Sequence, residues 1–240
     1  MIIISIPKSA SSSLLETISV LHGLPSSQID LKHLPVPGEF ESLSHIHQDI
    51  VNLDEDTHSL FSRNDRLYKQ HIPPTAHNLE LFRSQKKVIL IRRSVKDIIL
   101  AYRRAVQKKI HNPFQDFLDC ENESDWLNRA DEIGLDQELR NFKTRWIEEG
   151  ANYGNCHVVY YSDLLKNPNK AINSIERFWG FTISSDVALS KRRYSRTQGI
   201  QDFKAALGRK LVKIVIKVGI YKFLKNIQHL LRVSKFSYRW

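Results

Sequence analysis

The stretch IIISIPKSASSSLL, residues 2–15, decides how this chain of 240 residues folds. Residues 2–6 are a short run rich in β-branched side chains, which predicts a buried strand. Residues 7–13 are small and polar and predict a turn. Leu14, Ile18 and Leu21 then recur at helical spacing before Gly23, so a helix is expected after the turn. A strand joined to a helix by a short polar loop is typical of α/β proteins.

Strands and helices are expected to alternate along the rest of the chain. Residues 25–65 are polar and contain several prolines, which predicts irregular structure with short helices. The whole pattern predicts one α/β domain with a central, mainly parallel sheet flanked by helices. Ligands bind such sheets at the carboxyl ends of strands, so residues 7–13, 92–94 and 161–164 are the places to look for a site. The further strands are predicted at 66–71, 88–92 and 157–161, and the further helices at 79–84, 95–109, 135–149 and 168–179.

The formal net charge of +10, from 36 basic and 26 acidic residues, is unevenly distributed. No acidic residue follows Asp202, and the ten basic residues of segment 203–240 equal the whole excess. Residues 1–202 are therefore neutral overall, and nucleic acid is not expected as a partner.

Segment 204–240 is predicted to be a basic, amphipathic, helical extension of a main domain formed by residues 1–203. Lys210, Lys213 and Lys217 fall on one helical face. Two interpretations stay open. In one, the helices dock on the domain with their lysines in solvent; in the other, they make a peripheral contact with an anionic membrane.

The number of cysteines and the lengths of the apolar runs exclude several classes of protein. Two cysteines, Cys120 and Cys156, exclude a disulfide framework and a cysteine-based zinc cluster. No apolar run has the length of a membrane span, and residues 1–8 lack the basic region of a signal peptide. We therefore expect a cytoplasmic protein. His45 and His47 could suggest a metal site, but no third ligand is indicated, so no metal is expected.

The polar loop at residues 7–13 suits an oxyanion such as phosphate or sulfate. A helix N-terminus offers N–H groups and a partial positive charge, to which Lys8 adds a cation and the serines add hydroxyl donors. The alternative is a serine-rich helix cap beside a solvated lysine. The nucleotide-binding patterns GxxxxGK[ST] and GxGxxG are absent.

Five short segments, taken in order, resemble the sulfotransferases that use 3′-phosphoadenosine 5′-phosphosulfate (PAPS). PKSASS at 7–12 resembles the family's PKSGTT loop, and YKQHIP at 68–73 resembles its KTHLP strand end. VILIRRSVKDI at 88–98 is similar to VYxxRNPKDV. YSDL at 161–164, followed by Pro168 and FWG at 178–180, is similar to YEDL, P and FLG. RTQGIQDF at 196–203 is a weaker match to RKGxxGDW, so the resemblance covers about residues 2–203.

The resemblance implies a P-loop-kinase-like sulfotransferase fold and transfer of a sulfuryl group from PAPS to a hydroxyl or amine, without a metal. The product would be 3′-phosphoadenosine 5′-phosphate (PAP). His71 would be the general base, Lys8 would stabilise the leaving phosphate, and Lys69 would assist the transferring group. For His71, the alternative is a strand-end histidine held by a backbone carbonyl.

The resemblance also assigns the nucleotide site. Arg93 would hold the 3′-phosphate, with Arg92 as its rival if the strand register slips by one residue. Tyr161 would lie near the adenine ring. The full set carried over is Lys8, Ser9, Ala10, Ser11, Ser12, Ser13, Arg93, Ala101, Tyr161 and Arg196.

Several positions depart from the family pattern. Ala10 stands at the loop glycine, Ser13 at the adenine-stacking tryptophan and Ala101 at a serine that helps hold the 3′-phosphate. The 3′-phosphate site therefore has fewer of the polar residues that the family uses to hold this group. An alternative function is a degenerate, non-catalytic member that binds a nucleotide, or an anionic membrane through its tail. The acceptor class stays open among small molecules, lipids and carbohydrates, with residues 25–65 and 110–155 expected to shape its pocket, and no oligomeric state is indicated.

Overall fold

The computed structural model describes residues 1–91, 94–108, 110–111, 114–185 and 187–189. Within this part of the chain, five strands form one sheet in the order β2-β3-β1-β4-β5, and every neighbouring pair is parallel. The predicted mainly parallel α/β sheet is confirmed. The strands are β1 (Ile2–Ser5), β2 (Ser26–Ser27), β3 (Leu67–Gln70), β4 (Lys87–Ile91) and β5 (Cys156–Tyr160).

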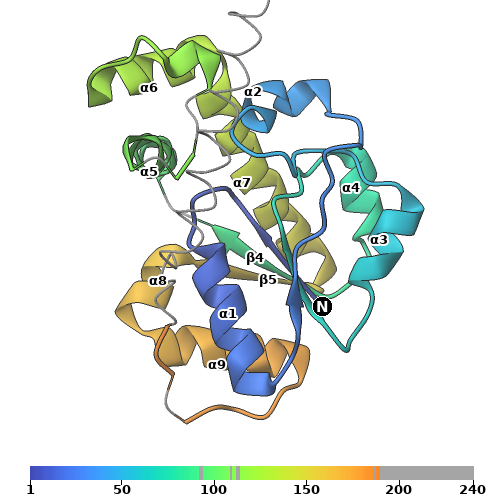
Figure 1. Cartoon of the computed structure of the whole chain (residues 1–240). Helices are drawn as coiled ribbons and strands as arrows, with labels where there is room; N and C mark the ends of the chain where they lie inside the picture. Colours follow the sequence, from blue (N-terminus) through green and yellow to red (C-terminus); the bar gives the residue numbers. More distant parts are fainter. Residues whose placement is uncertain (92–93, 109, 112–113, 186, 190–240) are drawn as a thin grey trace, which may run out of the picture. The chain divides into compact units, whose positions relative to one another are not determined.

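Helices connect the strands and cover both faces of the sheet (Figure 1). The polar stretch 25–65 contains short helices, as predicted. The α-helices of the described residues are α1 (Ser11–His22), α2 (Glu41–Ser44), α3 (Glu55–Phe61), α4 (Ala76–Leu81), α5 (Val95–Gln107), α6 (Glu123–Glu132), α7 (Leu135–Tyr153), α8 (Tyr161–Lys166) and α9 (Pro168–Trp179). Two 3₁₀ turns lie at Gly38–Phe40 and Gln115–Phe117.

Alternation along the strands divides the core into two layers. Ile3, Val88 and Leu90 pack with side chains of α1, α8 and α9 on one face. Their neighbours Ile2 and Ile89 join the core of the opposite face, which α5, α6 and α7 complete. All five of these strand residues are fully buried. Side chains of a strand alternate between the two faces of the sheet, and here both faces are apolar. This is the pattern of a parallel sheet enclosed between helices.

Local sequence signals explain several helix ends. Gly23 adopts a left-handed conformation after α1, as its position predicts. The Ser94 hydroxyl caps α5 by accepting from the Asp97 N–H. Asn122 and Asp125 form a reciprocal capping box at the start of α6.

Several boundaries differ by a few residues from the sequence-based expectation, and two of these differences have a local cause. Tyr161 was expected to end a strand, but it is the first residue of α8, since β5 stops at Tyr160. The helix predicted at 79–84 begins earlier because Thr75 caps α4 by accepting from the Asn78 N–H. The helices predicted within 204–240 lie outside the described residues.

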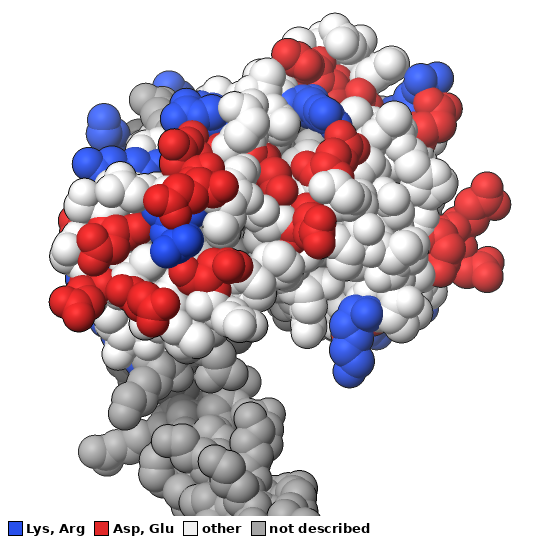
Figure 2. Space-filling model, turned by 90° about the horizontal axis from the view of Figure 1, so that it is seen from above, with Lys and Arg blue, Asp and Glu red and all other residues white. Residues whose placement is uncertain are grey.

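On the face of the molecule seen in Figure 2, acidic and basic side chains are interspersed, and the acidic ones form the larger gatherings. Within the described ranges, none of the helices combines the length and apolarity that crossing a bilayer requires.

Candidate active site

The loop between β1 and α1 is built from two residues in the left-handed region. Lys8 has φ 66° and Ala10 has φ 60°, and they flank Ser9. Such a conformation costs a residue with a side chain about 1 kcal/mol, so the loop is held against a local preference. The first backbone bonds of α1 run from the Ser13 and Leu14 N–H groups to the Ala10 carbonyl, at 3.0 and 3.2 Å. The N–H groups before Ser13 therefore fall outside the bonding pattern of the helix.

The Ser9 hydroxyl supports an anion site in this loop. Its side chain has no exposed surface, and Oγ has no hydrogen-bond partner among the described residues. A buried hydroxyl left unpaired costs ~1–3 kcal/mol. A phosphate or sulfate oxygen at the mouth of the loop would satisfy it, so the residues present fit the phosphosulfate of PAPS.

Lys8 is held beside two side chains that the sequence did not indicate. Its Nζ lies 2.5 Å from His111 Nε2 and 5.8 Å from the centre of the Tyr102 ring. Burial, and secondly the charge of Lys69, lower the pKa of Lys8 to about 8. Burial and the charge of Lys8 lower the pKa of His111 to about 4, so this imidazole is neutral at pH 7 and accepts from the ammonium.

His71 follows β3 and has its tautomer fixed by the end of β1. Its Nδ1 lies 2.6 Å from the Ser5 carbonyl oxygen, with the Ser5 hydroxyl at 3.0 Å. A carbonyl can only accept, so Nδ1 carries the proton and Nε2 keeps its lone pair. Burial lowers the pKa of His71 well below its usual 6.5, and the charges of His47 and Lys69 lower it further. The ring is therefore a neutral base at pH 7.

Lys69 lies beside the unprotonated nitrogen of the His71 ring. Its Nζ is 3.3 Å from His71 Nε2, and its charge is felt by Lys8 as well as by His71. The carboxyl ends of β1 and β3, which are parallel neighbours, thus bring Lys8, Lys69 and His71 together. The two ammonium groups can stabilise a bound anion, and the unprotonated ring nitrogen can take a proton from a group that reacts with that anion.

The remaining predicted site residues lie at three places. Ser11 is buried at the first turn of α1, and Ser12 and Ser13 are half-buried there. Ala101 is half-buried on α5, and Tyr161 is half-buried at the start of α8. Arg92, Arg93 and Arg196 lie outside the described residues.

Three residues near the site were missed by the sequence reasoning: Ser5, Tyr102 and His111. Ser5 acts through its backbone carbonyl, which any residue carries, so no signal could have identified it. Tyr102 is buried on α5, where its hydroxyl accepts from the Phe114 N–H over 3.2 Å. Its position next to Ala101 was the available signal.

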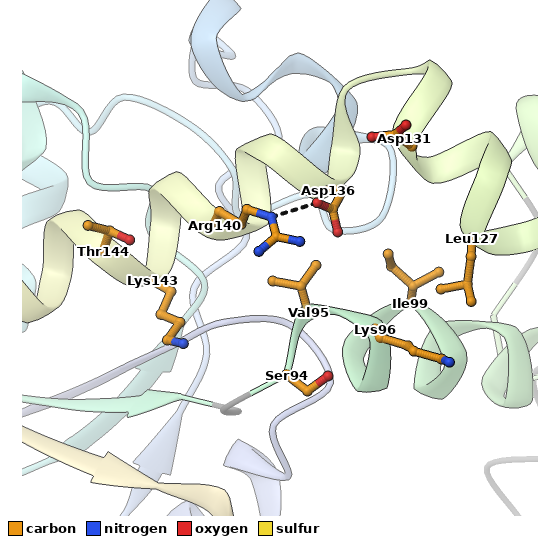
Figure 3. Close-up of a pocket in the computed structure, with 10 residues that line it drawn as sticks. All are labelled: Ser94, Val95, Lys96, Ile99, Leu127, Asp131, Asp136, Arg140, Lys143 and Thr144. Carbon is orange, nitrogen blue, oxygen red and sulfur yellow. Dashed lines mark hydrogen bonds and ion pairs between the residues drawn. The ribbon is translucent and has the colours of Figure 1, made fainter.

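A separate cavity of about 550 Å³ lies between α5, α6 and α7 (Figure 3). It contains none of the loop or histidine residues described above. Ile99 lines it, and Ala101 lies about 200° further around the helix, so Ala101 faces away from it. Arg140, one of its cations, is paired with Asp136 at 2.7 Å. This cavity is therefore distinct from the loop that fits an anion.

The pair His45 and His47 does not form a metal site in the described part of the chain. His45 stacks on Phe114 with ring centres 3.8 Å apart, whereas His47 packs against His71. No group of three or more histidine, cysteine or carboxylate side chains among the described residues could hold a metal ion.

Comparison with solved structures finds a sulfotransferase of similar fold. The solved structure of mouse sulfotransferase SULT7A1 complexed with PAP is similar, with a TM-score of 0.51 and 16% identity, over 77% of this chain and 59% of that one. A sulfotransferase from Alicyclobacillus acidocaldarius is similar with a TM-score of 0.49 and 13% identity, over 89% of this chain and 93% of that one. This chain thus spans less than two-thirds of the length of the mouse enzyme.

Sequence comparison with curated proteins found no significant match. The family model described as the sulfotransferase domain, however, matches residues 1–226. At the identities given above, the structural similarity to solved proteins supports the fold alone. Because the family model covers nearly the whole sequence, the chain belongs to the sulfotransferase domain family.

Proposed function

We propose that this chain transfers a sulfuryl group from PAPS to a hydroxyl or amine acceptor. Membership of the sulfotransferase domain family supports sulfuryl transfer in general. The observation that carries the detailed proposal is the unprotonated Nε2 of His71, which lies 3.3 Å from the Lys69 ammonium. Lys8, at the mouth of the anion loop, completes this arrangement.

The nucleotide would lie on the loop between β1 and α1. The Ser9 hydroxyl and the N–H groups of the first turn of α1 would hold the 5′-phosphosulfate, together with Ser11, Ser12 and Ser13. Arg93 and Arg196 would hold the 3′-phosphate, Ala101 would border it, and Tyr161 would lie near adenine. These assignments follow the resemblance in sequence, and the mouse enzyme of similar fold was solved with PAP.

His71 would act as the base. When bound, PAPS supplies a sulfuryl group whose bond to the 5′-phosphate oxygen breaks as the acceptor oxygen or nitrogen bonds to sulfur. The acceptor proton passes to His71 Nε2, and the electron pair of the broken bond stays on PAP. The Ser5 carbonyl would stabilise the imidazolium that forms, since it accepts the Nδ1 proton at 2.6 Å.

The two lysines would share the negative charge. Lys8 would leave His111 and donate to the oxygen between sulfur and phosphorus as charge grows there. Lys69 would turn from His71 to the sulfuryl oxygens once the acceptor occupies the space at Nε2. In both cases a lysine exchanges a neutral imidazole partner for an anion, which strengthens its hydrogen bond.

Calorimetric titration of the full chain with PAP, with 5′-AMP as control, tests the nucleotide site. Micromolar binding that depends on the 3′-phosphate is expected. Transfer from radiolabelled PAPS to a panel of alcohols and amines then tests the reaction, and Lys8→Ala and His71→Ala should each lower turnover by at least about 10²-fold in a folded protein. If neither nucleotide bound, the proposal would fail and the non-catalytic alternative would gain support.

The remaining sequence-based expectations stay predictions: the boundary between residues 203 and 204, a cytoplasmic location, and contact of the basic tail with an anionic membrane. A small-molecule, lipid or carbohydrate acceptor is part of the same proposal. Binding of the full chain to anionic and neutral vesicles would test the membrane contact directly.

A further inference from the structure

His47 packs its ring against the ring of His71, and the function proposed above does not use it. The two ring centres lie 4.0 Å apart and the ring planes meet at 69°, which is an edge-on contact. His71 is buried, while His47 is half-buried. Aromatic rings prefer edge-on contacts, because the positive edge of one ring meets the negative face of the other. His47 therefore makes a directed contact with the proposed base.

The segment around His47 holds this ring in place. The ring Nδ1 accepts from the Asp49 N–H over 3.3 Å, and the His47 N–H donates to the Leu43 carbonyl over 3.2 Å. The neighbouring side chains of Ile46 and Ile50 are buried in the core. The backbone on both sides of His47 is thus anchored, and one ring nitrogen is bound, so the ring has little freedom to turn.

The ring of His47 is neutral at pH 7. Burial lowers the pKa of His47 well below its usual 6.5, and nearby charges, chiefly that of Lys69, lower it further. The Asp49 carboxylate, 3.7 Å from Nδ1, therefore forms no ion pair with this ring. Because Nδ1 accepts a hydrogen bond, the proton of the neutral ring lies on Nε2. The contact with His71 is thus the packing of two uncharged rings.

His71 has polar contacts at both ring nitrogens, and the proposed reaction breaks one of them. Nδ1 lies 2.6 Å from the Ser5 carbonyl oxygen, and Nε2 lies 3.3 Å from Lys69 Nζ. The acceptor needs the space at Nε2, so Lys69 would turn away when the acceptor binds. The contact with Ser5 then holds one nitrogen, about which the ring can still swing. The His47 ring supplies the second point of support, because its packing does not depend on Lys69.

We infer that His47 is a positioning residue for sulfuryl transfer: its ring holds the His71 imidazole with Nδ1 on the Ser5 carbonyl and Nε2 toward the reacting group. This inference rests on the function proposed above. A base takes a proton efficiently only when it lies within hydrogen-bond reach and in the correct orientation. His47 acts through His71 and not on the reacting atoms.

Two substitutions separate the ring of His47 from its nitrogen. His47→Phe keeps a ring that can pack edge-on and loses the acceptor. His47→Asn loses the ring and keeps an acceptor for the Asp49 N–H, since asparagine side chains bond to the N–H two residues on. At saturating PAPS and acceptor, kcat should fall by at least about threefold in His47→Asn and stay within about twofold of the wild-type value in His47→Phe. The Kd for PAP should change little in both variants.

His58→Asn is the matched control. His58 also makes an edge-on contact, with its ring centre 4.7 Å from that of Phe82, but it does not pack on a proposed site residue. The same substitution there removes the same kind of ring contact from the core. It should leave kcat at the wild-type value, so a fall confined to His47→Asn reports on His71 and not on general packing.

Nitrogen-15 NMR of the nucleotide-free full chain tests the orientation of His71 without turnover. In the wild-type chain, His47→Phe and His58→Asn, Nδ1 should carry the proton and Nε2 should be unprotonated. In His47→Asn the His71 signals should shift toward a mixture of the two tautomers, because the ring can turn off the carbonyl that selects one of them. A nuclear Overhauser contact between the His47 and His71 ring protons is also expected in the wild-type chain and requires no variant.

The outcomes separate the two proposals. An unchanged kcat or an unchanged tautomer in His47→Asn, or no contact between the ring protons in the wild-type chain, would overturn the role of His47 and leave the proposed function standing. A loss in His47→Phe as large as in His47→Asn would assign the effect to the nitrogen and overturn the role of the ring. If the wild-type chain bound no PAP and transferred nothing, the proposed function would fail, whereas NMR would still decide whether His47 holds the ring of His71.

Discussion

Binding of a phosphate or sulfate group beside Lys8 is expected to draw a proton from solvent. The lysine has a pKa of about 8 in the nucleotide-free chain because it is buried and faces Lys69. An anion at Nζ favours the charged form, so the bound lysine should return toward its ordinary value of about 10.4. Nucleotide binding therefore protonates the fraction of Lys8 that was neutral before.

The magnitude follows from the pKa of Lys8. With a free value of about 8, binding should take up about 0.5 proton at pH 8 and about 0.9 proton at pH 9. The same linkage fixes the sign of the pH dependence: affinity for PAP should fall about fivefold from pH 8 to pH 9. Neither the nucleotide phosphates nor His111 change protonation in this pH range. The pKa of His111 is about 4 in the free chain and rises toward its ordinary value when Lys8 leaves it.

Calorimetric titration with PAP in buffers of different ionisation enthalpy measures this uptake directly. Lys8→Met should show none at pH 8 or 9, whereas Lys166→Met, at an exposed position of α8, should match the wild-type chain. Wild-type uptake near zero at pH 8 would mean that Lys8 is already charged before binding. Equal uptake in Lys8→Met would assign the proton to another group. Either result would refute the reasoning.

Three further predictions concern single residues of the site. His71→Ala should lower kcat by about 10²- to 10⁴-fold, as for loss of a general base, with the Kd for PAP unchanged in calorimetry; a parallel loss of affinity would contradict a role confined to proton transfer. Ala10→Gly should raise the free energy of unfolding in urea by up to ~1 kcal/mol, since glycine tolerates φ 60° without strain, and a less stable variant would show that the strain estimate is wrong. Arg93→Ala should weaken binding of PAP more than that of 5′-AMP, and equal losses would place the 3′-phosphate contact elsewhere.

Much of the fold was predictable because β1 and β4 are mainly apolar runs. Residues 2–5 and 87–91 are fully buried on both faces, and such runs alternate with helical spacing along the chain. The two-residue strand β2 could not be predicted, since Ser26 and Ser27 carry no strand signal and pair only because β3 lies beside them. Tyr161 was misassigned because the run HVVYY reads as one strand, whereas α8 begins at its last residue.

The candidate site was predictable only where its residues are close in sequence. Lys8 and Ser9 share the loop, and Lys69 and His71 share one strand end, so short segments revealed them. His111 comes from a third segment, and only tertiary packing brings its ring to Lys8. No local pattern marks such a residue, because its burial and its partners are properties of the folded chain.

The proton on His71 is placed by the main chain. The Ser5 carbonyl that receives it ends β1, and β1 and β3 pair in the register that sets Ile4 opposite Gln70. Every amino acid at position 5 would provide the same oxygen, so mutation of that side chain cannot by itself move the proton to the other ring nitrogen. Substitutions that shift the register of β1 and β3 or weaken their pairing would instead impair His71 as a base, and some of these positions lie far from the loop. In a screen for inactive variants, buried isoleucines of β1 should therefore appear beside the lysines and the histidine, although they never touch a substrate.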